Sequence, residues 1–441
     1  MNNINICIAG LGNVGSALVH LIEKNAELVK NKSDLNINVI GLSAKNKTKK
    51  RNFNIEKYFW VDDPMQLLNI KDEKPDVLIE LIGYEKDISY ELVKSALKQK
   101  ISVVTGNKAM LAMHGNELFN IAEKNKVLLL FEAAVAGGIP IIKTIKNNIF
   151  LNKINKISGI LNGTTNYILT TMESENKSFE DVLTDAKQKG FTSDHESKLD
   201  IGGYDAAHKL TILSSICFGI PLNFESIYIE GIESIELDDL NYAKDLGYAI
   251  KHLAIGRKNN DGIELRVHSC LIPKTRLIAN VDGVKNAVVV SSDAAGPTLY
   301  YGAGAGSLAT ASSVVSDIID ISRKKLSESN NSVPLLSYQR NELQNKKILD
   351  INEIESRYYL RIRVTNKPGV LADITKIFGS KSISIESILQ KEDLVNDENV
   401  PIVLVTHEVV EKNIIEALKD IEKLEVVKGK IIKIRIEELE S

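Results

Sequence analysis

Two charged side chains near the middle of the chain are spaced for joint chemistry. Asp205 and Lys209 lie four residues apart, where apolar spacing predicts a helix over residues 206–217. Residues four apart share one helix face, so a carboxylate there can hold an acid/base lysine, beside a substrate amine that a second carboxylate such as Asp200 binds. The spacing alone favours an ordinary surface ion pair, worth about 0.3–0.5 kcal/mol, over this hypothesis.

A second lysine follows a predicted strand. Ile101–Thr105 has the pattern of a strand, and Gly106, Asn107 and Lys108 come directly after it. In open α/β sheets ligands bind beyond the carboxyl ends of the strands, which would place Lys108 at the junction of cofactor and substrate. The alternative is an exposed lysine without a function, and geometry alone does not separate the two.

One carboxylate stands in an otherwise apolar loop, Phe-Glu-Ala-Ala-Val-Ala-Gly-Gly-Ile-Pro, at residues 131–140. Backbone carbonyl groups together with Glu132 could hold a hard cation, because such ions prefer oxygen ligands. A buried hinge between two domains explains the same composition equally well. The seven histidines show no metal-ligand spacing.

A glycine-rich loop at residues 10–15 reads GLGNVG and matches the pattern G-x-G-x-x-G. It follows a predicted strand and opens a predicted helix, the context in which this pattern binds a dinucleotide. Gly10 allows a tight turn, Gly12 lets the backbone approach a pyrophosphate, and Gly15 permits close packing of helix and strand. The helix N-terminus adds N–H donors for the phosphates. The alternative is a glycine-rich turn in an ordinary α/β protein, but the context favours nucleotide binding.

The choice of cofactor should be visible at the end of the second predicted strand, Ile37–Leu42. An NAD enzyme usually has Asp or Glu there for the ribose hydroxyls, whereas this strand runs into Gly-Leu-Ser-Ala. Five cations follow without an intervening acid: Lys45, Lys47, Lys49, Lys50 and Arg51. They favour the 2′-phosphate of NADP(H), with NAD(H) as the alternative cofactor. The alternative is a solvated basic loop that has no role in cofactor binding.

Composition excludes several classes of protein. The formal charge of −3, from 55 Lys and Arg against 58 Asp and Glu, argues against a nucleic-acid-binding surface. No apolar stretch reaches the roughly 18 residues that span a bilayer, and the N-terminus lacks the pattern of a signal peptide. The three cysteines, Cys7, Cys217 and Cys270, are too far apart for a disulfide scaffold or a zinc cluster. We therefore expect a cytoplasmic protein with neither nucleic-acid nor membrane partners.

The predicted elements indicate about three domains, as the length of 441 residues also does. In residues 1–137 strands alternate with helices, which predicts an α/β Rossmann domain with a parallel sheet covered on both faces. The predicted strands are Ile4–Ala9, Ile37–Leu42, Val77–Ile82, Ile101–Thr105 and Val127–Phe131, and the helices are 13–30, 91–99 and 116–125.

The rest of the chain has a different pattern. Residues 138–301 predict an α+β domain, and a glycine-rich loop and a helix follow at 302–323. The polar, aperiodic segment 324–356 predicts a linker. Residues 357–441 carry elements in the ferredoxin-like order β-α-β-β-α-β. The predicted strands there are 358–364, 383–389, 402–405 and 431–436, and the helices are 369–378 and 412–421.

Seven motifs occur in a fixed order within residues 1–325. They are GLGNVG at 10–15, ELIGY at 80–84, VVTGNKAMLA at 103–112, FEAAVAGGIPIIKT at 131–144, GILNGTTNYIL at 159–169, DIGGYDAAHKLTIL at 200–213 and GAGAG at 302–306. Together they resemble the homoserine dehydrogenase family, in its longer bacterial form. A generic Rossmann protein would not carry both NGTTNYIL and DAAHK. The resemblance implies reversible NAD(P)H-dependent reduction of L-aspartate 4-semialdehyde to L-homoserine, in threonine, methionine and isoleucine biosynthesis.

The resemblance also implies roles for single residues. Lys209 would be the acid/base lysine, Asp205 a catalytic and substrate-binding aspartate, and Lys108 a contact of both cofactor and substrate. Residues 138–301 would be the substrate-binding, catalytic and dimerisation domain, and residues 302–323 would return to the Rossmann domain and complete it. The implied sodium site consists of Glu132, Val135, Gly137 and Ile139, mostly through backbone carbonyls. The implied cofactor contacts are Gly10, Gly12, Asn13, Val14, Gly15, Lys45, Thr105, Lys108, Gly190 and Gly306.

One segment departs from the family pattern. The family usually has Gly-Tyr-x-Glu-x-Asp-Pro before the catalytic segment, with a substrate-binding Glu, whereas this chain has Gly-Phe-Thr-Ser-Asp-His-Glu-Ser at 190–197. Counting back from Lys209 puts Asp194 at the Glu position, and counting forward from Gly190 puts Ser193 there. We choose Asp194 as a substrate ligand, with Asp200 and Asp205, because a carboxylate can bind an ammonium group.

The tail resembles an ACT domain. Its first predicted strand leads into Val-Thr-Asn-Lys-Pro-Gly-Val-Leu at 364–371. ACT domains commonly pair side by side and bind amino acids near this turn, so the resemblance implies an amino-acid effector, with L-threonine as the candidate, and a homodimer or homotetramer. The alternative is an oligomerisation module that binds no ligand.

Two other functions stay open at this point. A non-catalytic amino-acid sensor with Rossmann and ACT domains would bind threonine without turnover and would have lost Lys108 or Lys209, yet both are present. Another ACT-bearing dehydrogenase, for prephenate or phosphoglycerate, is the second. The glycine loop at residue 10 argues against the phosphoglycerate enzyme, whose cofactor loop normally lies in mid-chain.

Overall fold

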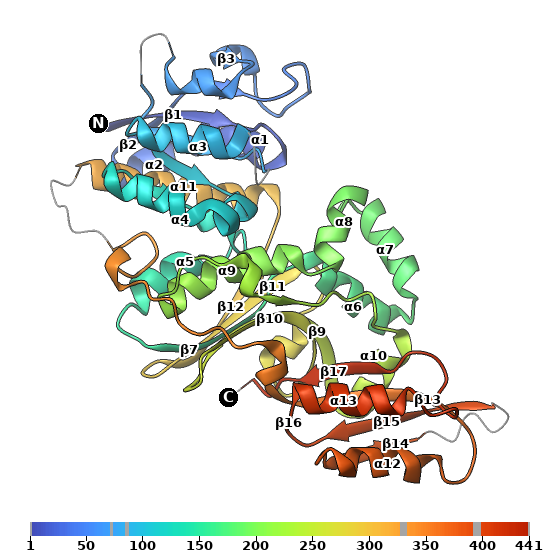
Figure 1. The fold of residues 1–441 in the computed structure, drawn as a ribbon. Helices are drawn as coiled ribbons and strands as arrows, with labels where there is room; N and C mark the ends of the chain where they lie inside the picture. Colours follow the sequence, from blue (N-terminus) through green and yellow to red (C-terminus); the bar gives the residue numbers. More distant parts are fainter. Residues whose placement is uncertain (1, 71–73, 84–87, 327–332, 391–397, 440–441) are drawn as a thin grey trace. The chain divides into compact units, whose positions relative to one another are not determined.

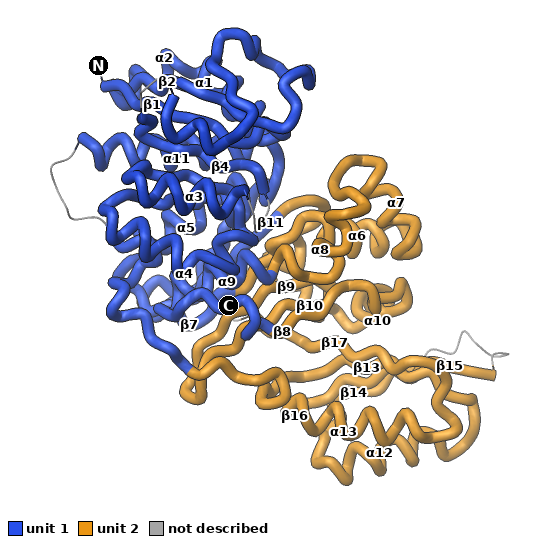
Figure 2. The backbone as a smooth tube through the Cα atoms, turned by 45° about the horizontal axis from the view of Figure 1, so that its top comes forward, with its two compact units in different colours: residues 1–157, 207–227, 286–346 blue, residues 158–206, 228–285, 347–441 orange. Residues whose placement is uncertain are grey.

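The computed structural model describes residues 2–70, 74–83, 88–326, 333–390 and 398–439, and these form two compact units (Figure 2). Unit 1 comprises residues 1–157, 207–227 and 286–346, and unit 2 comprises 158–206, 228–285 and 347–441. The strand β7 (Ile154–Ile160) and the helix α9 (Tyr204–Phe218) each begin in one unit and end in the other. Neither unit is therefore a single stretch of chain.

Unit 1 is built on a six-stranded parallel sheet in the order β3-β2-β1-β4-β5-β6. Figure 1 labels its strands β1, β2 and β3. The strands are β1 (Asn2–Ala9), β2 (Leu35–Ser43), β3 (Trp60–Val61), β4 (Val77–Glu80), β5 (Ser102–Thr105) and β6 (Leu129–Leu130). This order reverses between β1 and β4, which is the switch point of a doubly wound dinucleotide-binding sheet. The predicted α/β Rossmann fold is confirmed.

The helices of unit 1 differ from the prediction in their bounds. The helix predicted over 13–30 is two helices, α1 (Asn13–Lys24) and α2 (Ala26–Ser33), because Asn25 leaves the helical conformation between them. The predicted helix 116–125 is the second half of α4 (Lys108–Lys124), which follows α3 (Ile88–Lys98).

The helix α11 (Ser307–Leu326) belongs to the core of the parallel sheet. Its residues Ala311, Val314 and Ile318 share a buried cluster with residues of β1, β4 and α1. The strands β11 (Lys285–Ser292) and β12 (Gly296–Ala303), which are neighbours in a second sheet, precede α11. The short helix α5 (Ile141–Lys143) continues as a π-helical turn over Thr144–Asn148.

The segment predicted as a linker, 324–356, is packed where the structure describes it; its residues 327–332 lie outside the described part. Leu335 and Leu336 are buried. The Tyr338 hydroxyl donates to the carbonyl of Cys217, and the Lys346 ammonium donates to the carbonyl of Phe218 at the end of α9. Residues 333–346 are thus attached to unit 1.

Six strands of unit 2 are neighbours in one sheet, in the order β9-β10-β17-β13-β15-β14. They are β9 (Tyr248–Lys258), β10 (Ile263–Pro273), β13 (Glu355–Thr365), β14 (Ile385–Leu389), β15 (Asn399–Thr406) and β17 (Ile432–Ile436). The last four, with α12 (Val370–Ser380) and α13 (Glu411–Ile421), form the predicted ferredoxin-like arrangement. Because β17 runs parallel to β10, with Arg435 opposite Cys270, this sheet continues the β9–β10 hairpin.

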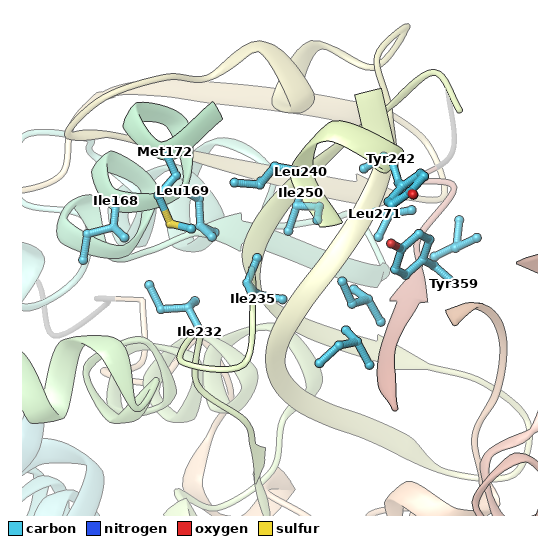
Figure 3. Packing of buried hydrophobic residues seen from close by; sticks show 14 of the residues in the cluster. Ile168, Leu169, Met172, Ile232, Ile235, Leu240, Tyr242, Ile250, Leu271 and Tyr359 are labelled. Carbon is cyan, nitrogen blue, oxygen red and sulfur yellow. The ribbon is translucent and has the colours of Figure 1, made fainter. Parts of the chain in front are cut away.

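Four helices accompany this sheet: α6 (Gly163–Glu175), α7 (Phe179–Gln188), α8 (Asp194–Ile201) and α10 (Leu237–Asp245). The two-residue strands β8 (Tyr228–Ile229) and β16 (Val409–Val410) pair at its margins. A buried cluster joins Ile168 and Leu169 of α6 and Leu271 of β10 to Tyr359 of β13 (Figure 3). The hairpin and the ferredoxin-like part therefore share one core.

Candidate active site

The three glycines of the loop at 10–15 each meet a different steric demand. Gly10 has φ +99°, and a Cβ there would lie 2.4 Å from the carbonyl oxygen of Leu81. A Cβ on Gly15 would lie 2.0 Å from the carbonyl oxygen of Gly10. At Gly12, by contrast, a Cβ would meet nothing within 4 Å. Gly10 and Gly15 thus serve packing, and the space over Gly12 is open.

The helix α1 begins directly behind this open space. Gly12 is its N-cap, and no side chain caps the N–H groups of the first turn, Asn13, Val14 and Gly15. Backbone donors and the positive end of the helix dipole at an open glycine fit an anion such as a pyrophosphate. The predicted cofactor contacts of this loop stay a prediction, and its open glycine and uncapped helix N-terminus are compatible with them.

The buried carboxylate of Glu80 connects the carboxyl ends of β4 and β5. Glu80, the last residue of β4, is fully buried. One of its oxygens accepts from the Thr105 hydroxyl at 2.6 Å, and the other accepts from the Ser89 hydroxyl at 3.0 Å and from the N–H of Ile82 at 2.8 Å. Glu80 was given no role from the sequence, although it opens the motif ELIGY; Tyr84 of that motif lies outside the described residues.

Lys108 is the first residue of α4. The preceding Asn107 caps the helix, since its side-chain oxygen accepts from the N–H of Met110 at 3.1 Å, and its own N–H donates to the Thr105 hydroxyl at 3.0 Å. Lys108 itself is half-buried. The chain from Glu80 through Thr105 to Asn107 therefore fixes the start of the helix that carries this lysine.

The basic loop after β2 forms a small cavity of about 430 Å³ that Lys47, Lys49 and Lys50 line. Arg51 lines it too, but its guanidinium is engaged with the loop itself. It donates to the carbonyls of Asn46 at 2.6 Å, Lys47 at 3.0 Å and Lys49 at 2.9 Å. Lys45 lies exposed at the start of the loop. The lysines are thus the cations that face solvent here.

The loop at 131–139 holds its carboxylate inside the protein. Glu132 is 2% exposed, and its two oxygens accept from the N–H groups of Ile142 and Lys143, both at 2.9 Å. Burial, and then the nearby charge of Asp317, raise the pKa of Glu132 to about 7. This carboxylate would gain from a cation beside it.

Backbone carbonyls gather around the same loop. Ala136 and Gly137 both have positive φ, 55° and 45°. A Cβ on Gly137 would lie 2.6 Å from the carbonyl oxygen of Gly304, so the GAGAG loop lies against this one. The Gly137 carbonyl accepts from the Ser313 hydroxyl at 2.6 Å, and the Ile139 carbonyl accepts from the N–H of Ile141 at 2.8 Å. One carboxylate and several carbonyls are a donor set that fits a hard cation.

The predicted helix that carries Asp205 and Lys209 is confirmed as α9. Lys209 is 8% exposed, so the surface ion pair that the spacing alone favoured does not describe it. The neighbouring His208 stacks on Phe224 with ring centroids 4.5 Å apart, so it faces an aromatic ring.

Two of the predicted substrate carboxylates meet at one amide in unit 2. The Asn162 side-chain nitrogen donates to Asp200 at 2.7 Å and to Asp205 at 2.8 Å. Asp200 also accepts from the Thr192 hydroxyl at 2.7 Å. Asn162 and Thr192 were not assigned roles from the sequence, although Asn162 lies in the motif NGTTNYIL. The signal for Asn162 was the motif alone, and no signal marks Thr192, which lies in the segment 190–197 that departs from the family pattern.

Asp194 has a different environment. It is the first residue of α8, and Ser193 caps this helix. The Asp194 carboxylate is 93% exposed and pairs with Lys187 at 2.8 Å, which lowers its pKa.

The two glycines predicted to contact the cofactor, Gly190 and Gly306, have φ of +73° and +113°, and a Cβ on either would meet nothing within 4 Å.

Two kinds of feature are absent from the described residues. No group of three or more His, Cys, Asp or Glu side chains is arranged there to hold a metal ion. Among the helices of the described part, none is both long enough and apolar enough to cross a membrane.

Three family models match the chain. The homoserine dehydrogenase model matches residues 140–319, the model for the NAD-binding domain of homoserine dehydrogenase matches residues 10–132, and the ACT domain model matches residues 358–425.

Full-length relatives agree with these models. The homoserine dehydrogenase of Pseudomonas aeruginosa is 45% identical over 440 residues and covers 100% of both chains. The crystal structure of a homoserine dehydrogenase from Thiobacillus denitrificans is 44% identical and covers 100% of this chain and 99% of its own, with a TM-score of 0.92. A hyperthermophilic archaeal homoserine dehydrogenase mutant in complex with NADPH is 28% identical over 73% of this chain and 98% of its own, with a TM-score of 0.62.

Proposed function

The chain belongs to the homoserine dehydrogenase family, and on this premise we propose how its residues carry out the reaction. That reaction is the reversible NAD(P)H-dependent reduction of L-aspartate 4-semialdehyde to L-homoserine, a step of amino-acid biosynthesis. The observation that carries the proposal is the 45% identity over full length to a homoserine dehydrogenase. The buried Lys209 and the open glycine loop supply its chemistry.

Lys209 is the proposed acid/base group. Reduction adds a hydride and a proton to the aldehyde, and the bound nicotinamide supplies the hydride. Negative charge then develops on the carbonyl oxygen, and the Lys209 ammonium stabilises this charge and donates the proton. In the reverse direction the neutral amine takes the proton from the hydroxyl. The 8% exposure of Lys209 limits competition from bulk water.

The other groups bind and orient. Asp200 and Asp205 are the proposed ligands of the substrate ammonium group, and Lys108 is proposed to contact cofactor and substrate from the start of α4. Asp194 stays a proposed third carboxylate ligand, and it would have to exchange its bond with Lys187 for one with the substrate. Carboxylates stabilise an ammonium group that lies between them, because its positive charge compensates their negative charges.

We propose NADP(H) as the preferred cofactor, with NAD(H) as the alternative. Support comes from the three lysines that line the cavity of the basic loop, Lys47, Lys49 and Lys50, and from the exposed Lys45 beside them. A 2′-phosphate is an anion that such a cluster attracts. Arg51 supports this choice indirectly, because its bonds to three carbonyls hold the loop in shape.

We propose a sodium ion at the loop formed by Glu132, Val135, Gly137 and Ile139. Its support is the buried carboxylate, whose two oxygens accept from backbone N–H groups, together with the carbonyls of the 135–139 turn. The ion would compensate the charge of Glu132 and fix the turn against the GAGAG loop. No step of the reaction requires it.

We propose that the ACT domain binds an amino-acid effector, with L-threonine as the candidate, and that the chain forms a homodimer or homotetramer in the cytoplasm. The ACT domain itself supports the first part. The alternative of a non-catalytic sensor is not favoured, because the chain matches a homoserine dehydrogenase over its full length and keeps Lys108 and Lys209.

Steady-state oxidation of L-homoserine by the purified chain tests these proposals, with NADP⁺ and NAD⁺, each with and without L-threonine. We expect a lower KM for NADP⁺ than for NAD⁺, and inhibition by threonine.

Lys209→Ala should lower kcat by about 10²–10⁴-fold, the usual contribution of an acid/base group. Lys98→Ala, which changes an exposed lysine at the end of α3, is the control and should leave kcat unchanged. Undiminished turnover by Lys209→Ala contradicts the acid/base role, and threonine binding without homoserine turnover favours the sensor.

A further inference from the structure

One amide group holds two carboxylates in unit 2. The Asn162 amide nitrogen lies 2.7 Å from an oxygen of Asp200 and 2.8 Å from an oxygen of Asp205. A side-chain amide carries two N–H donors, so each carboxylate receives one of them. Asn162 is 38 and 43 residues away from these partners along the chain, and the contact is therefore a product of the fold.

The amide is itself fixed in place. Asn162 is 5% exposed and is the N-cap of α6, and its side-chain oxygen accepts from the N–H of Thr165 at 2.8 Å. Because the oxygen must face that donor, the nitrogen must face the carboxylates, and the orientation of the amide follows from the network. The next residue leaves no room to shift, since a Cβ on Gly163 would lie 2.7 Å from the carbonyl oxygen of Val284.

A second neutral donor holds the other oxygen of Asp200. The Thr192 hydroxyl, which is 7% exposed, lies 2.7 Å from it. Two carboxylates that accept from one amide nitrogen repel each other, and the neutral N–H and O–H donors that hold them add no positive charge. A cationic ligand group can therefore reduce the repulsion between the two carboxylates.

Helix capping does not account for the choice of asparagine. Ser and Asp cap a helix about as well as Asn, because capping needs only a side-chain acceptor. Among these residues, Asn alone can accept from the helix and donate two hydrogen bonds at the same time. An Asp at this position would add a third carboxylate to the cluster.

We propose that Asn162, with Thr192, is a positioning residue for substrate recognition, which holds Asp200 and Asp205 together as a two-carboxylate seat for the ammonium group of the substrate. This inference rests on the proposed function. Asn162 contacts neither the reacting carbonyl nor the hydride in this role; it acts through the two aspartates. The ammonium group is present in substrate and transition state alike, so its loss of binding should raise KM and leave kcat nearly unchanged.

The test uses Asn162→Ser in the full-length chain, which keeps a capping acceptor and removes both donors. A hydrogen bond to a charged group contributes about 1.5–3 kcal/mol, so we expect KM for L-homoserine to rise by about 10–100-fold. The KM for NADP⁺ and kcat should change less than about threefold. Ser178→Ala is the matched control, because Ser178 caps α7 in the same unit and contacts no proposed substrate ligand. It should lower stability and leave both KM values unchanged.

Thr192→Val is the second variant, and it decides the question if Asn162→Ser does not fold. It removes one donor to Asp200 and should raise KM for L-homoserine by about three- to tenfold, again without a change for NADP⁺. An unchanged KM for L-homoserine in the folded variants overturns the proposal. A fall in kcat together with a rise in both KM values overturns it too. If the wild-type chain does not oxidise L-homoserine, the proposed function fails first and this inference falls with it, which is a different result from an active enzyme whose variants bind normally.

Discussion

Glu132 in unit 1 and Glu411 in unit 2 are buried to nearly the same degree, 2% and 1% exposed, yet their pKa values move in opposite directions. Burial raises the pKa of a carboxyl group because it disfavours the charged form. The pKa of Glu132 is raised to about 7, by burial and then by the charge of Asp317. The pKa of Glu411 is lowered to about 2, against the effect of burial. The partners of each carboxylate make the difference.

Glu411 is surrounded by charged partners. Its oxygens accept from Nε and Nη2 of Arg435 at 2.8 and 2.7 Å, from the Tyr358 hydroxyl at 2.6 Å, and from the Lys433 ammonium. Arg266 of β10 makes similar pairs nearby, with Glu264 at 3.1 Å and Glu437 at 2.6 Å. The six side chains that we call the unit 2 ion cluster are Arg266, Lys433, Arg435, Glu264, Glu411 and Glu437. Its positive and negative charges are matched at the seam between β10 and β17.

Glu132 has a poorer set of partners. Its carboxylate accepts from two backbone N–H groups, while the nearby Lys143 ammonium pairs instead with Asp317 at 3.0 Å and Asp320 at 2.7 Å. A buried carboxylate that is paired directly with cations of the protein fastens two parts of the fold together, whereas a buried carboxylate that is hydrogen-bonded to backbone N–H groups is suited to a ligand. The two glutamates therefore mark a structural seam and a candidate ion site.

The largest effect should come from removing a cation of the unit 2 ion cluster. Arg435→Met leaves Glu411 buried without its main partner, and breaking such a pair costs about 3–5 kcal/mol. We expect the amide protons of β13 and β17 to lose hydrogen-exchange protection by that amount. The single tryptophan, Trp60, lies in unit 1, so the unfolding transition that it reports should stay in place.

Lys423→Met is the control for this variant. Lys423 pairs with Asp420 at 2.8 Å, but its side chain is 74% exposed. An exposed pair of this kind contributes about 0–1 kcal/mol. If Arg435→Met costs no more than Lys423→Met, the ion cluster is not what holds the seam.

Acid should destabilise the seam between β10 and β17. The folded-state pKa of Glu411 is depressed, so its contribution to stability is present above the unfolded-state value of about 4.5 and is lost as the pH falls towards 2. The expected loss across this range is on the order of 3 kcal/mol. Exchange of the β17 amides at pH 6 and at pH 3 measures the part of this loss that falls above pH 3, about 2 kcal/mol. Glu411→Gln should remove most of this pH dependence, and an unaltered dependence in that variant would point to other carboxylates.

Part of the fold and of the candidate site could be predicted from the sequence, because that part depends on residues close together in the chain. Gly10, Gly12 and Gly15 could be interpreted because each glycine role depends on the adjacent turn, and the helix that carries Asp205 and Lys209 could be predicted from its own periodicity. The break at Asn25 was missed because apolar spacing continues through it. Local signals thus gave the elements more reliably than their bounds.

The contacts that distinguish the two glutamates depend on distant partners. Every residue of β10 except Pro273 is buried, and the polarity of Glu264, Arg266 and His268 gives no sign of this burial in the sequence. The sequence likewise gives no sign that Arg435 and Glu411 are buried partners. Asn162 could not be assigned because its two carboxylate partners are specified only by the folded chain.

The smallest expected effect concerns the ion site at Glu132. If sodium binds there, replacing choline chloride by sodium chloride at equal ionic strength should stabilise unit 1, by about 1.4 kcal/mol when sodium is at ten times its Kd. Unfolding followed by Trp60 fluorescence measures this, while the protection of the β17 amides should not respond to the choice of cation. Glu132→Gln removes the charge at nearly constant volume and should abolish the difference between the two salts. A sodium effect that persists in Glu132→Gln, or that appears equally in both units, would mean that the ion acts elsewhere, and the contrast between the two glutamates would then be one of packing alone.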